Sequence, residues 1–351
     1  MSEDDFDITF TMVNTGSLEV CVRERRFHEE GFPVVFVHGN VSSSPFFFPA
    51  MEALGDQWRP LAVDLRGFGG TDTAPVDATR GLADFADDVR DALDGMDIGD
   101  VHLVGWSMGA GVAMQMLLDD PARFRSVTLI NPVSPYGFGG TSGADGRLLS
   151  PDAAGSGGGT ASPVFVQALK DGDYSSDSPH APRNVLRTFY VAPGWDGSHE
   201  EMFVASMLST SVGDDNYPGD SVPTSHWPGT AAGNRGVLNT MAPTHLDLSG
   251  IVDVSPKPPI LWIRGGKDQI VGDHSMFDLA ALGEIGAIPG WPGAEVAPAQ
   301  PMLVQTRSVL DAYANNGGRY VEKVFPECGH SPHIEDVPGF VAALEAHLAA
   351  V

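Results

Sequence analysis

A single serine stands between two glycines in VHLVGWSMGAGVAMQM, residues 101–116, where an apolar run gives way to a helical pattern. Gly105 to Gly109 form G-x-S-x-G, the only match to that pattern in the chain. With 42 glycines present, the motif is weak by itself. An apolar strand before Ser107 and a helix after it predict a tight turn that exposes the hydroxyl. We interpret Ser107 as a nucleophile, with a glycine-rich turn as the alternative.

A serine nucleophile needs a base that removes its proton. The expected base is His330, which follows Gly329 directly in FPECGHSPHIED, after the last expected strand. His333 is a nearby alternative, but it belongs to the start of the final helical region and has no preceding glycine. We therefore favour His330 as the base.

The base needs an acid that orients it, and the acid should follow an earlier strand. In PILWIRGGKDQIV, Asp268 lies three residues beyond the expected strand end. The stretch after SVTLIN reads PVSPYG and offers no carboxylate, which favours Asp268. Asp273 is a more distant alternative. Asp268 also has a purely structural interpretation, as a loop carboxylate paired with Lys267 or Arg264.

The oxyanion formed by acyl transfer needs hydrogen-bond donors. One expected donor is the N–H of Met108, at the positive end of the helix after the serine. The other is the N–H of Asn40 in VFVHGNVSSS, where Gly39 lets the backbone approach a substrate. A plain strand-to-loop turn is the alternative interpretation of His38 to Asn40.

Apolar runs alternate with helical patterns along most of the chain, which predicts an α/β fold with a mostly parallel central sheet and helices on both faces. A turn at NTGS predicts an antiparallel hairpin at the start. The expected strands are residues 7–14, 18–25, 33–39, 59–67, 101–105, 126–131, 259–265 and 319–325, and the expected helices are 43–54, 82–96, 107–118, 302–316 and 337–350.

The alternation breaks between residues 132 and 256, which is too long for a plain loop in a compact domain. We interpret this stretch as a large inserted cap with a mobile glycine-rich start, and residues 1–131 and 257–351 as the core. A disordered linker is the alternative, but the aromatic content favours packing. A second irregular stretch, 272–300, is expected near the rim of the site.

Taken in order, the HG after the first parallel strand, DLRGFGGT (64–71), GWSMG, GGKD and GHSPHIED resemble the α/β-hydrolase superfamily over residues 33 to 340. The resemblance implies an α/β-hydrolase fold and structural roles for Asp64 and Arg66 near the site. HGNVSSSPFFF is also similar to haloalkane dehalogenases. Those enzymes and the related epoxide hydrolases use an aspartate nucleophile, so Ser107 argues against both chemistries.

The chain carries 46 acidic and 20 basic residues, a formal net charge of −26. This charge disfavours nucleic acids and anionic membranes as partners. The start, MSEDDFDITF, has neither a basic nor an apolar segment of a signal peptide, and no run is long enough to span a bilayer. Cys21 and Cys328 form no disulfide framework. We expect a cytoplasmic protein with a small-molecule substrate, and a homodimer is compatible with the sequence.

The expected reaction is hydrolysis of an ester or lactone of small to medium hydrophobic groups through an acyl-enzyme, with no metal and no cofactor. Gly39, Phe46, Phe47 and Trp106 flank the expected site and are candidate substrate-binding residues. Amidase, peptidase and carbon–carbon bond hydrolase activities use the same triad in similar capped members. A ligand-binding homologue with slow turnover, a cofactor-free lyase and a perhydrolase also remain open.

Overall fold

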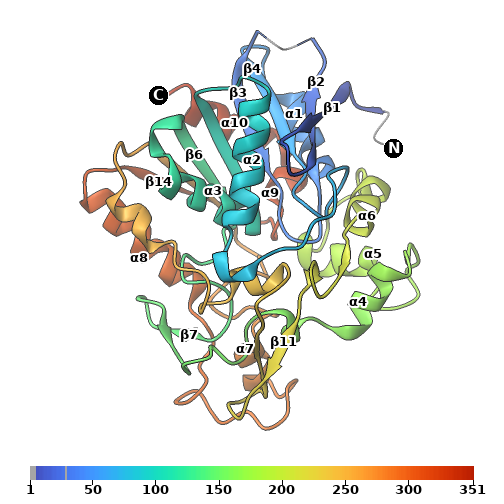
Figure 1. Cartoon of the computed structure of the whole chain (residues 1–351), viewed down its shortest axis with the longest axis vertical. Helices are drawn as coiled ribbons and strands as arrows, with labels where there is room; N and C mark the ends of the chain where they lie inside the picture. The colour runs from blue at the N-terminus through green and yellow to red at the C-terminus, as the bar shows by residue number, and fades with distance from the viewer. Residues whose placement is uncertain (1–4, 28–29) are drawn as a thin grey trace.

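The computed structural model describes residues 5–27 and 30–351, and in that part of the chain eight strands form one twisted sheet (Figure 1). Their order across the sheet is β1-β2-β4-β3-β5-β6-β13-β14. The hairpin pairs β1 with β2, and β2 pairs with β4, both antiparallel, while every other neighbouring pair is parallel. The strands are β1 Ile8–Asn14, β2 Glu19–Arg25, β3 Phe32–Val37, β4 Trp58–Val63, β5 Val101–Trp106, β6 Phe124–Ile130, β13 Ile260–Gly265 and β14 Tyr320–Phe325.

Helices cover both faces of this sheet, as the alternating pattern predicts. In Figure 1, α2, α3 and α8 lie on the near face, and α1 packs with α10 on the far face. All of the core helices expected from the sequence are present, with ends that differ by a few residues. They are α1 Phe48–Ala53 (preceded by a 3₁₀ turn at Ser44–Phe47), α2 Ala83–Gly95, α3 Met108–Asp119, α8 Met302–Asn315 and α10 Val337–Leu348.

The central strands are apolar because helices cover them on both sides. All six residues of β5 are buried, as are the last four of β3. By contrast, β14 lies at the edge, and most of its side chains are partly or fully exposed. The fold class expected from the sequence is therefore confirmed, and the carboxyl ends of β3, β5, β6 and β13 meet at one edge of the sheet.

Residues 132–256, called the insertion below, lie between β6 and β13 and occupy the right-hand side and the lower part of Figure 1. Their side chains pack tightly, with Leu186, Phe203 and Met207 completely or almost completely buried. A linker without packing is therefore ruled out for this segment. Its elements are β7 Thr141–Ser142, β8 Arg147–Leu148, α4 Pro163–Lys170, α5 Pro182–Val185, a π-helical turn at Leu186–Tyr190, α6 Glu200–Leu208, β9 Val212–Gly213, β10 Tyr217–Pro218, β11 Ser221–Pro223 and β12 Thr230–Ala232.

The glycine-rich start of the insertion is packed, contrary to the mobile segment expected from its composition. The N–H of Gly139 donates to Oε1 of Gln300 at 2.6 Å, and Nε2 of Gln300 donates to the Gly137 carbonyl at 3.0 Å. A Cβ on Gly139 would lie 2.5 Å from the Gly155 carbonyl oxygen. The glycines therefore permit close backbone approaches, which composition alone does not distinguish from flexibility.

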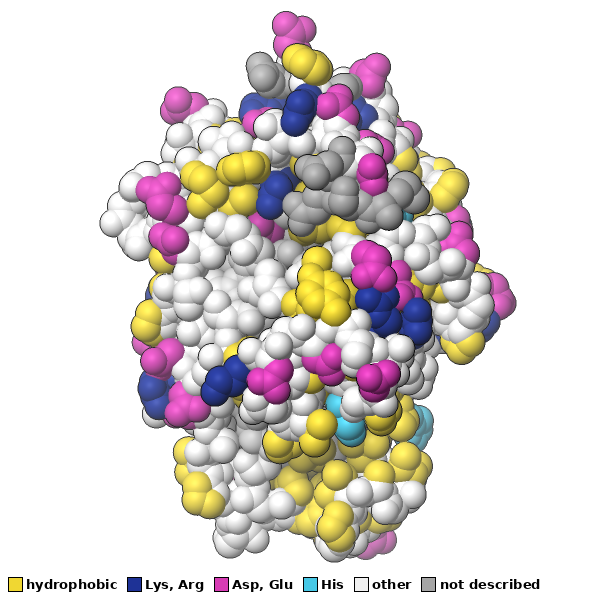
Figure 2. All heavy atoms as spheres, turned by 90° about the vertical axis from the view of Figure 1, so that its right-hand side faces the viewer, with side chains coloured by type: hydrophobic (Ala, Val, Ile, Leu, Met, Phe, Trp, Pro, Cys, Tyr) yellow, Lys and Arg dark blue, Asp and Glu magenta, His cyan; other side chains and the backbone are white. Residues whose placement is uncertain are grey.

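Within 272–300, α7 (Leu279–Glu284) and its flanking loops lie beside the insertion, as Figure 1 shows. Hydrophobic side chains gather at this lower end of the molecule in Figure 2, and the exposed apolar residues of these segments include Val222, Ile285 and Val296. Across 5–27 and 30–351, no helix combines the length and apolar character needed to cross a membrane. The first four residues of MSEDDFDITF lie outside the described part.

Candidate active site

Ser107 sits at the turn between β5 and α3 with φ of 57° and ψ of −119°. L-residues rarely adopt a positive φ, so the turn stores strain at this position. A Cβ on Gly105 would lie 2.3 Å from the Gly109 carbonyl oxygen, and a Cβ on Gly109 would lie 2.3 Å from the His38 carbonyl oxygen. Both glycines are therefore required because strand, turn and helix approach each other too closely for any side chain.

His330 and Asp268 lie together although 62 residues separate them. The Nδ1 atom of His330 is 2.9 Å from Oδ2 of Asp268, and the two side chains are 2% and 3% exposed. The other oxygen of Asp268 accepts the N–H groups of Ile270 and Val271 at 2.8 and 3.1 Å. These two bonds fix the carboxylate, so that its second oxygen is directed at the imidazole.

The two cations considered as partners of Asp268, and the alternative acid Asp273, are each bonded to other groups. Lys267 pairs with Glu327 at 2.7 Å, and Arg264 pairs with Glu322 at 2.6 Å, so neither cation neutralises Asp268. Asp273 accepts the N–H of Leu303 at 2.9 Å in the first turn of α8. Asp273 thus serves as a helix-terminal acceptor, and Asp268 is the acid that contacts the imidazole.

His333 is buried among aromatic rings and bonds through neither ring nitrogen to any residue of the described chain. Its ring lies 4.7 Å from that of Trp106 and 4.9 Å from that of Phe47. Burial, together with the nearby His330, holds its pKa well below 6.5. A neutral His333 without a carboxylate partner does not have the orienting acid that His330 has.

The backbone carbonyl of His330 is hydrogen-bonded to the side chain of Trp106, the residue before Ser107. Nε1 of Trp106 donates to the His330 carbonyl at 2.8 Å, and Nδ2 of Asn131 donates to the same oxygen at 2.7 Å. The Oδ1 of Asn131 accepts the Gly265 N–H at 3.0 Å, which connects the ends of β6 and β13. Asn131 was missed by the sequence analysis, although a polar residue at the end of SVTLIN was the available signal.

Glu335 also holds the loop around His330 and was likewise missed. Its carboxylate accepts the N–H groups of Gly329 at 2.9 Å and Ser331 at 3.2 Å, on either side of the histidine. It also accepts the N–H of Ala192 at 2.6 Å. Burial raises the pKa of Glu335, and these three backbone donors oppose that rise. GHSPHIED contains this glutamate, but sequence spacing does not reveal that it folds back.

The loop after β3 passes directly against Ser107. A Cβ on Gly39 would lie 3.0 Å from the Cβ of Ser107, so a side chain there would crowd the hydroxyl. Nε2 of His38 accepts the Leu65 N–H at 3.0 Å, which leaves Nδ1 to donate to the Gly39 carbonyl at 2.8 Å. Burial lowers the pKa of His38, so it is a neutral structural histidine beside the candidate donor Asn40.

The aromatic residues proposed from the sequence as substrate-binding are completely buried here. Phe46 packs between Trp106 and Phe203, with ring centroids 5.1 and 4.6 Å away. Phe47 lies against Phe36, with centroids 5.0 Å apart. Phe46 and Phe47 are part of the apolar core, and Trp106 adds its indole bond to the His330 carbonyl.

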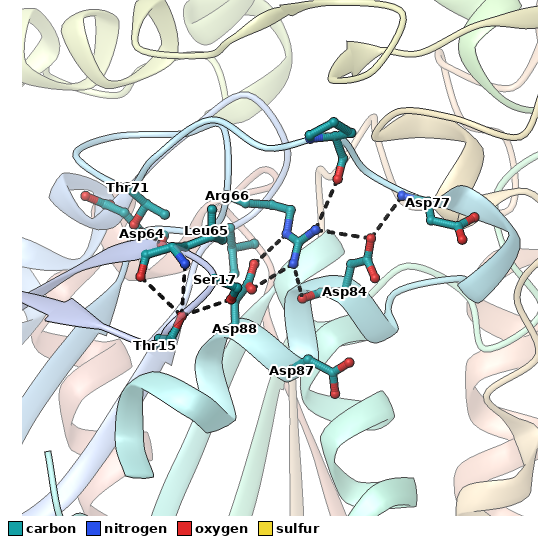
Figure 3. A network of polar contacts seen from close by, with 12 residues as sticks. Thr15, Ser17, Asp64, Leu65, Arg66, Thr71, Asp77, Asp84, Asp87 and Asp88 are labelled. Carbon is teal, nitrogen blue, oxygen red and sulfur yellow. Dashed lines mark hydrogen bonds and ion pairs between the residues drawn. The ribbon is translucent and has the colours of Figure 1, made fainter. Parts of the chain in front are cut away.

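Asp64 and Arg66 hold the loop after β4, as the resemblance implies. Arg66 makes a forked pair with Asp88 at 2.6 and 2.8 Å and reaches Asp84 at 3.2 Å, as Figure 3 shows. Asp64 accepts the Ser44 N–H at 2.7 Å beside the loop after β3. These buried charges fix α2 and two loops relative to the sheet.

Two hollows lie in the described part of the molecule, and the second of them borders on Glu335 and Lys267. One, of about 100 Å³, is lined by residues that include Ser150, His226, Trp227 and Asp278; the other lies near Trp195 and Cys328. Burial raises the pKa of the Cys328 thiol to about 12, so this cysteine is no thiolate nucleophile. In residues 5–27 and 30–351, no group of three or more His, Cys, Asp or Glu side chains is arranged to hold a metal ion.

Comparisons with known proteins agree with the fold described above. A family model described as the alpha/beta hydrolase fold matches residues 33–297. RutD of Variovorax paradoxus, provisionally named a carbamate hydrolase, is 36% identical over 127 residues, which make up 36% of this chain and 47% of that protein. Carboxylesterase YbfK of Bacillus subtilis is 30% identical over 103 residues, 29% of this chain and 34% of that protein. The chain thus spans less than half the length of these curated relatives.

A solved structure resembles the whole chain. The esterase EaEST of Exiguobacterium antarcticum has a TM-score of 0.60 and 17% sequence identity, covering 97% of this chain and 99% of that one. At this identity the likeness shows the shared fold.

Proposed function

The chain belongs to the α/β-hydrolase family, and we propose that it is a serine hydrolase that cleaves an ester or lactone through an acyl-enzyme. The observation that carries the proposal is the buried bond between Asp268 and His330, whose carbonyl accepts the indole N–H of Trp106, the residue before the strained Ser107 turn. A nucleophile on a tight turn, a histidine and an orienting carboxylate are the three parts that acyl transfer requires.

In the proposed first step, Ser107 Oγ attacks the substrate carbonyl carbon while His330 takes the hydroxyl proton. The negative charge moves to the carbonyl oxygen, where the N–H groups of Met108 and Asn40 are the proposed donors. The tetrahedral intermediate then collapses, and His330 gives its proton to the departing alcohol. Asp268 keeps the imidazole in the productive tautomer and stabilises its positive charge.

Water completes the cycle by the same chemistry. His330 removes a proton from the water molecule as it attacks the acyl-enzyme carbonyl. Collapse of this second intermediate returns the proton to Ser107 and releases the carboxylic acid. Every proton transfer passes through one imidazole, so no metal or organic cofactor is required.

The proposed substrate class is an uncharged ester or lactone with small to medium hydrophobic groups. Aromatic rings pack against Trp106, the residue before Ser107, and the insertion is proposed to act as a cap over the site. The net charge of −26 disfavours anionic substrates. A carbamate or amide is the second candidate, because the same nucleophile attacks those carbonyls and RutD is provisionally named a carbamate hydrolase.

The test is mass spectrometry after a fluorophosphonate probe, with Ser107→Ala as control, beside turnover of p-nitrophenyl butyrate. We expect labelling at Ser107 alone and loss of esterase activity in proportion to it. Folded protein that is neither labelled nor active would contradict the proposal and favour a ligand-binding role. Labelling with rapid cleavage of anilides rather than esters would move the assignment to an amidase.

A further inference from the structure

One short segment of the insertion, Tyr190 to Ala192, contacts the loops on both sides of the proposed catalytic centre. These are the oxyanion loop (residues 38–42) after β3 and the histidine loop (residues 326–331) after β14. Tyr190 and Ala192 are 7% and 5% exposed, so both contacts are shielded from water. Hydrogen bonds in such surroundings are stronger than at the surface, and their loss is correspondingly costly.

On the oxyanion side, the Tyr190 hydroxyl donates to the Asn40 carbonyl at 2.9 Å and lies 3.4 Å from the Val41 carbonyl. Val41 has a φ of 47°, which is unfavourable for a β-branched residue and needs support from its surroundings. Burial raises the pKa of Tyr190, so its hydroxyl stays protonated and able to donate. The tyrosine therefore holds the loop in a conformation that it would not keep alone.

On the histidine side, the Ala192 N–H donates to Glu335, whose carboxylate also accepts the N–H groups of Gly329 and Ser331. The two backbones touch here, because a Cβ on Gly329 would lie 2.8 Å from the Ala192 nitrogen. Glu335 thus fixes the residues before and after His330 and joins both to the insertion.

The aromatic ring of Tyr190 makes a third contact, with the rings of Trp106 and His330. Its centroid lies 5.8 Å from that of Trp106 and 6.0 Å from that of His330, both in edge-to-face geometry. The tyrosine therefore lies between the oxyanion loop and the catalytic imidazole. A displacement of its hydroxyl would move Asn40 relative to the histidine.

We propose that Tyr190 and Glu335 are positioning residues through which the insertion sets the distance between the oxyanion loop and the histidine loop. The inference rests on the proposed function, because it assigns these residues to the same site. It predicts that the insertion contributes to transition-state stabilisation as well as covering the site. Misplacing one oxyanion donor forfeits part of the roughly 10²–10³-fold in kcat that such a donor supplies.

The first test compares Tyr190→Phe with Tyr313→Phe. Tyr313 is also completely buried and donates to a backbone carbonyl, that of Pro258, at 2.5 Å, but it lies on α8. For p-nitrophenyl butyrate we expect Tyr190→Phe to lower kcat about tenfold or more with KM changed less than threefold. Affinity for a phenylboronic acid, which mimics the tetrahedral intermediate, should fall in parallel with kcat. Equal kcat in the two variants would overturn the inference.

The second test compares Glu335→Gln with Asp278→Asn. Asp278 is a buried carboxylate that accepts the N–H groups of Gln300 and Ala280, in the 272–300 segment away from His330. In Glu335→Gln the side-chain nitrogen faces a backbone donor, so one bond becomes a repulsion. We expect kcat to fall at least tenfold, while Asp278→Asn changes stability but leaves kcat within a factor of two.

Hydrogen exchange separates this inference from the proposed function. The inference predicts faster amide exchange in the oxyanion loop of Tyr190→Phe and in the histidine loop of Glu335→Gln, with no such change in either control. If the wild-type protein hydrolyses esters, but amide exchange and kcat in Tyr190→Phe and Glu335→Gln equal those of their control variants, only the positioning role is wrong. If it hydrolyses no ester, the proposed function fails, and the exchange pattern alone supports or overturns the positioning role.

Discussion

In the core, Ser107, Asp268 and His330 each follow a strand of the central sheet, whereas Tyr190 and Ala192 lie on an irregular segment of the insertion. Strand ends are fixed by the hydrogen-bond register and by glycines such as Gly109, which allow the chain to turn. The insertion is fixed by individual side chains, such as Gln300, that satisfy its backbone groups. Regular elements therefore place the proposed reacting groups, and single hydrogen bonds place the segment of the insertion that contacts their loops.

The largest effect expected is on the core, from Asp268→Asn. The asparagine presents either a weaker acceptor or a wrong donor to His330 Nδ1, so kcat should fall roughly 10³–10⁴-fold. The measurement is kcat for p-nitrophenyl butyrate, with circular dichroism to verify folding. Asp273→Asn is the matched control, because Asp273 bonds the start of α8. A comparable loss in Asp273→Asn would show that the acid was misassigned.

Acid should destabilise the core of the fold. Burial lowers the pKa of both His102, in β5, and His347, in α10, from 6.5 to about 4. Below pH 6.5 these two histidines therefore bind protons in the unfolded chain but not in the folded protein. The free energy of unfolding falls as the pH drops from 6.5 towards 4. For His102, which is 4% exposed, a lowering from 6.5 to about 4 corresponds to roughly 3 kcal/mol.

Urea unfolding at pH 7.0 and 5.0 measures this effect, since few carboxylates titrate in that interval. The variant His102→Leu removes one of the titrating groups and should flatten the dependence. An unchanged pH slope in that variant would mean that His102 is protonated in the folded state.

A smaller effect is expected from Gln300→Ala in the support of the insertion. The substitution leaves the buried N–H of Gly139 and carbonyl of Gly137 unsatisfied, which costs about 1–3 kcal/mol. Limited proteolysis should then cut within residues 137–160, while kcat for a small ester stays within a factor of three. Gln115→Ala is the control, because its bond to Asp119 is exposed. Retained protease resistance in Gln300→Ala would show that other contacts order the glycine-rich start.

The smallest effect is expected from salt, and it should act on both regions. At neutral pH the net charge of −26 repels itself, and raising NaCl from 0.05 to 1 M screens that repulsion. We expect a gain on the order of 1 kcal/mol in the free energy of unfolding. At pH 4.5, near the isoelectric point, the gain should largely disappear. An equal gain at both pH values would indicate preferential hydration rather than charge screening.

Most of the core was predictable from sequence, because its signals are local. The apolar runs predict buried strands, and the glycines around Ser107 predict a tight turn for the steric reason that the structure shows. His330 and Asp268 were chosen by their positions after strands, and the 2.9 Å bond brings them together. Parallel strands end at the same edge of a sheet. Motifs that each follow such a strand are therefore expected to lie close together.

The insertion was predictable only as a break in the pattern. Its glycines predict mobility, yet they allow backbones to pack closely. In the core, the sequence likewise predicts that Phe46 and Phe47 bind substrate, although both side chains are fully buried. Periodicity reports local burial but not which distant group satisfies a given backbone atom.

The sequence by itself therefore determined the α/β fold, the turn that carries Ser107 and the order of the candidate catalytic residues. Only the tertiary structure decided that Asn131 and Glu335 hold the histidine loop and that Tyr190 spans to Asn40. The contacts of Asn131 with His330, Tyr190 with Asn40 and Glu335 with Ala192 join residues 143 to 199 positions apart in the chain, whereas Glu335 reaches Gly329 and Ser331 by folding back over six and four positions. Their partners are mostly backbone groups, which every residue carries, so no residue type in the sequence marks them.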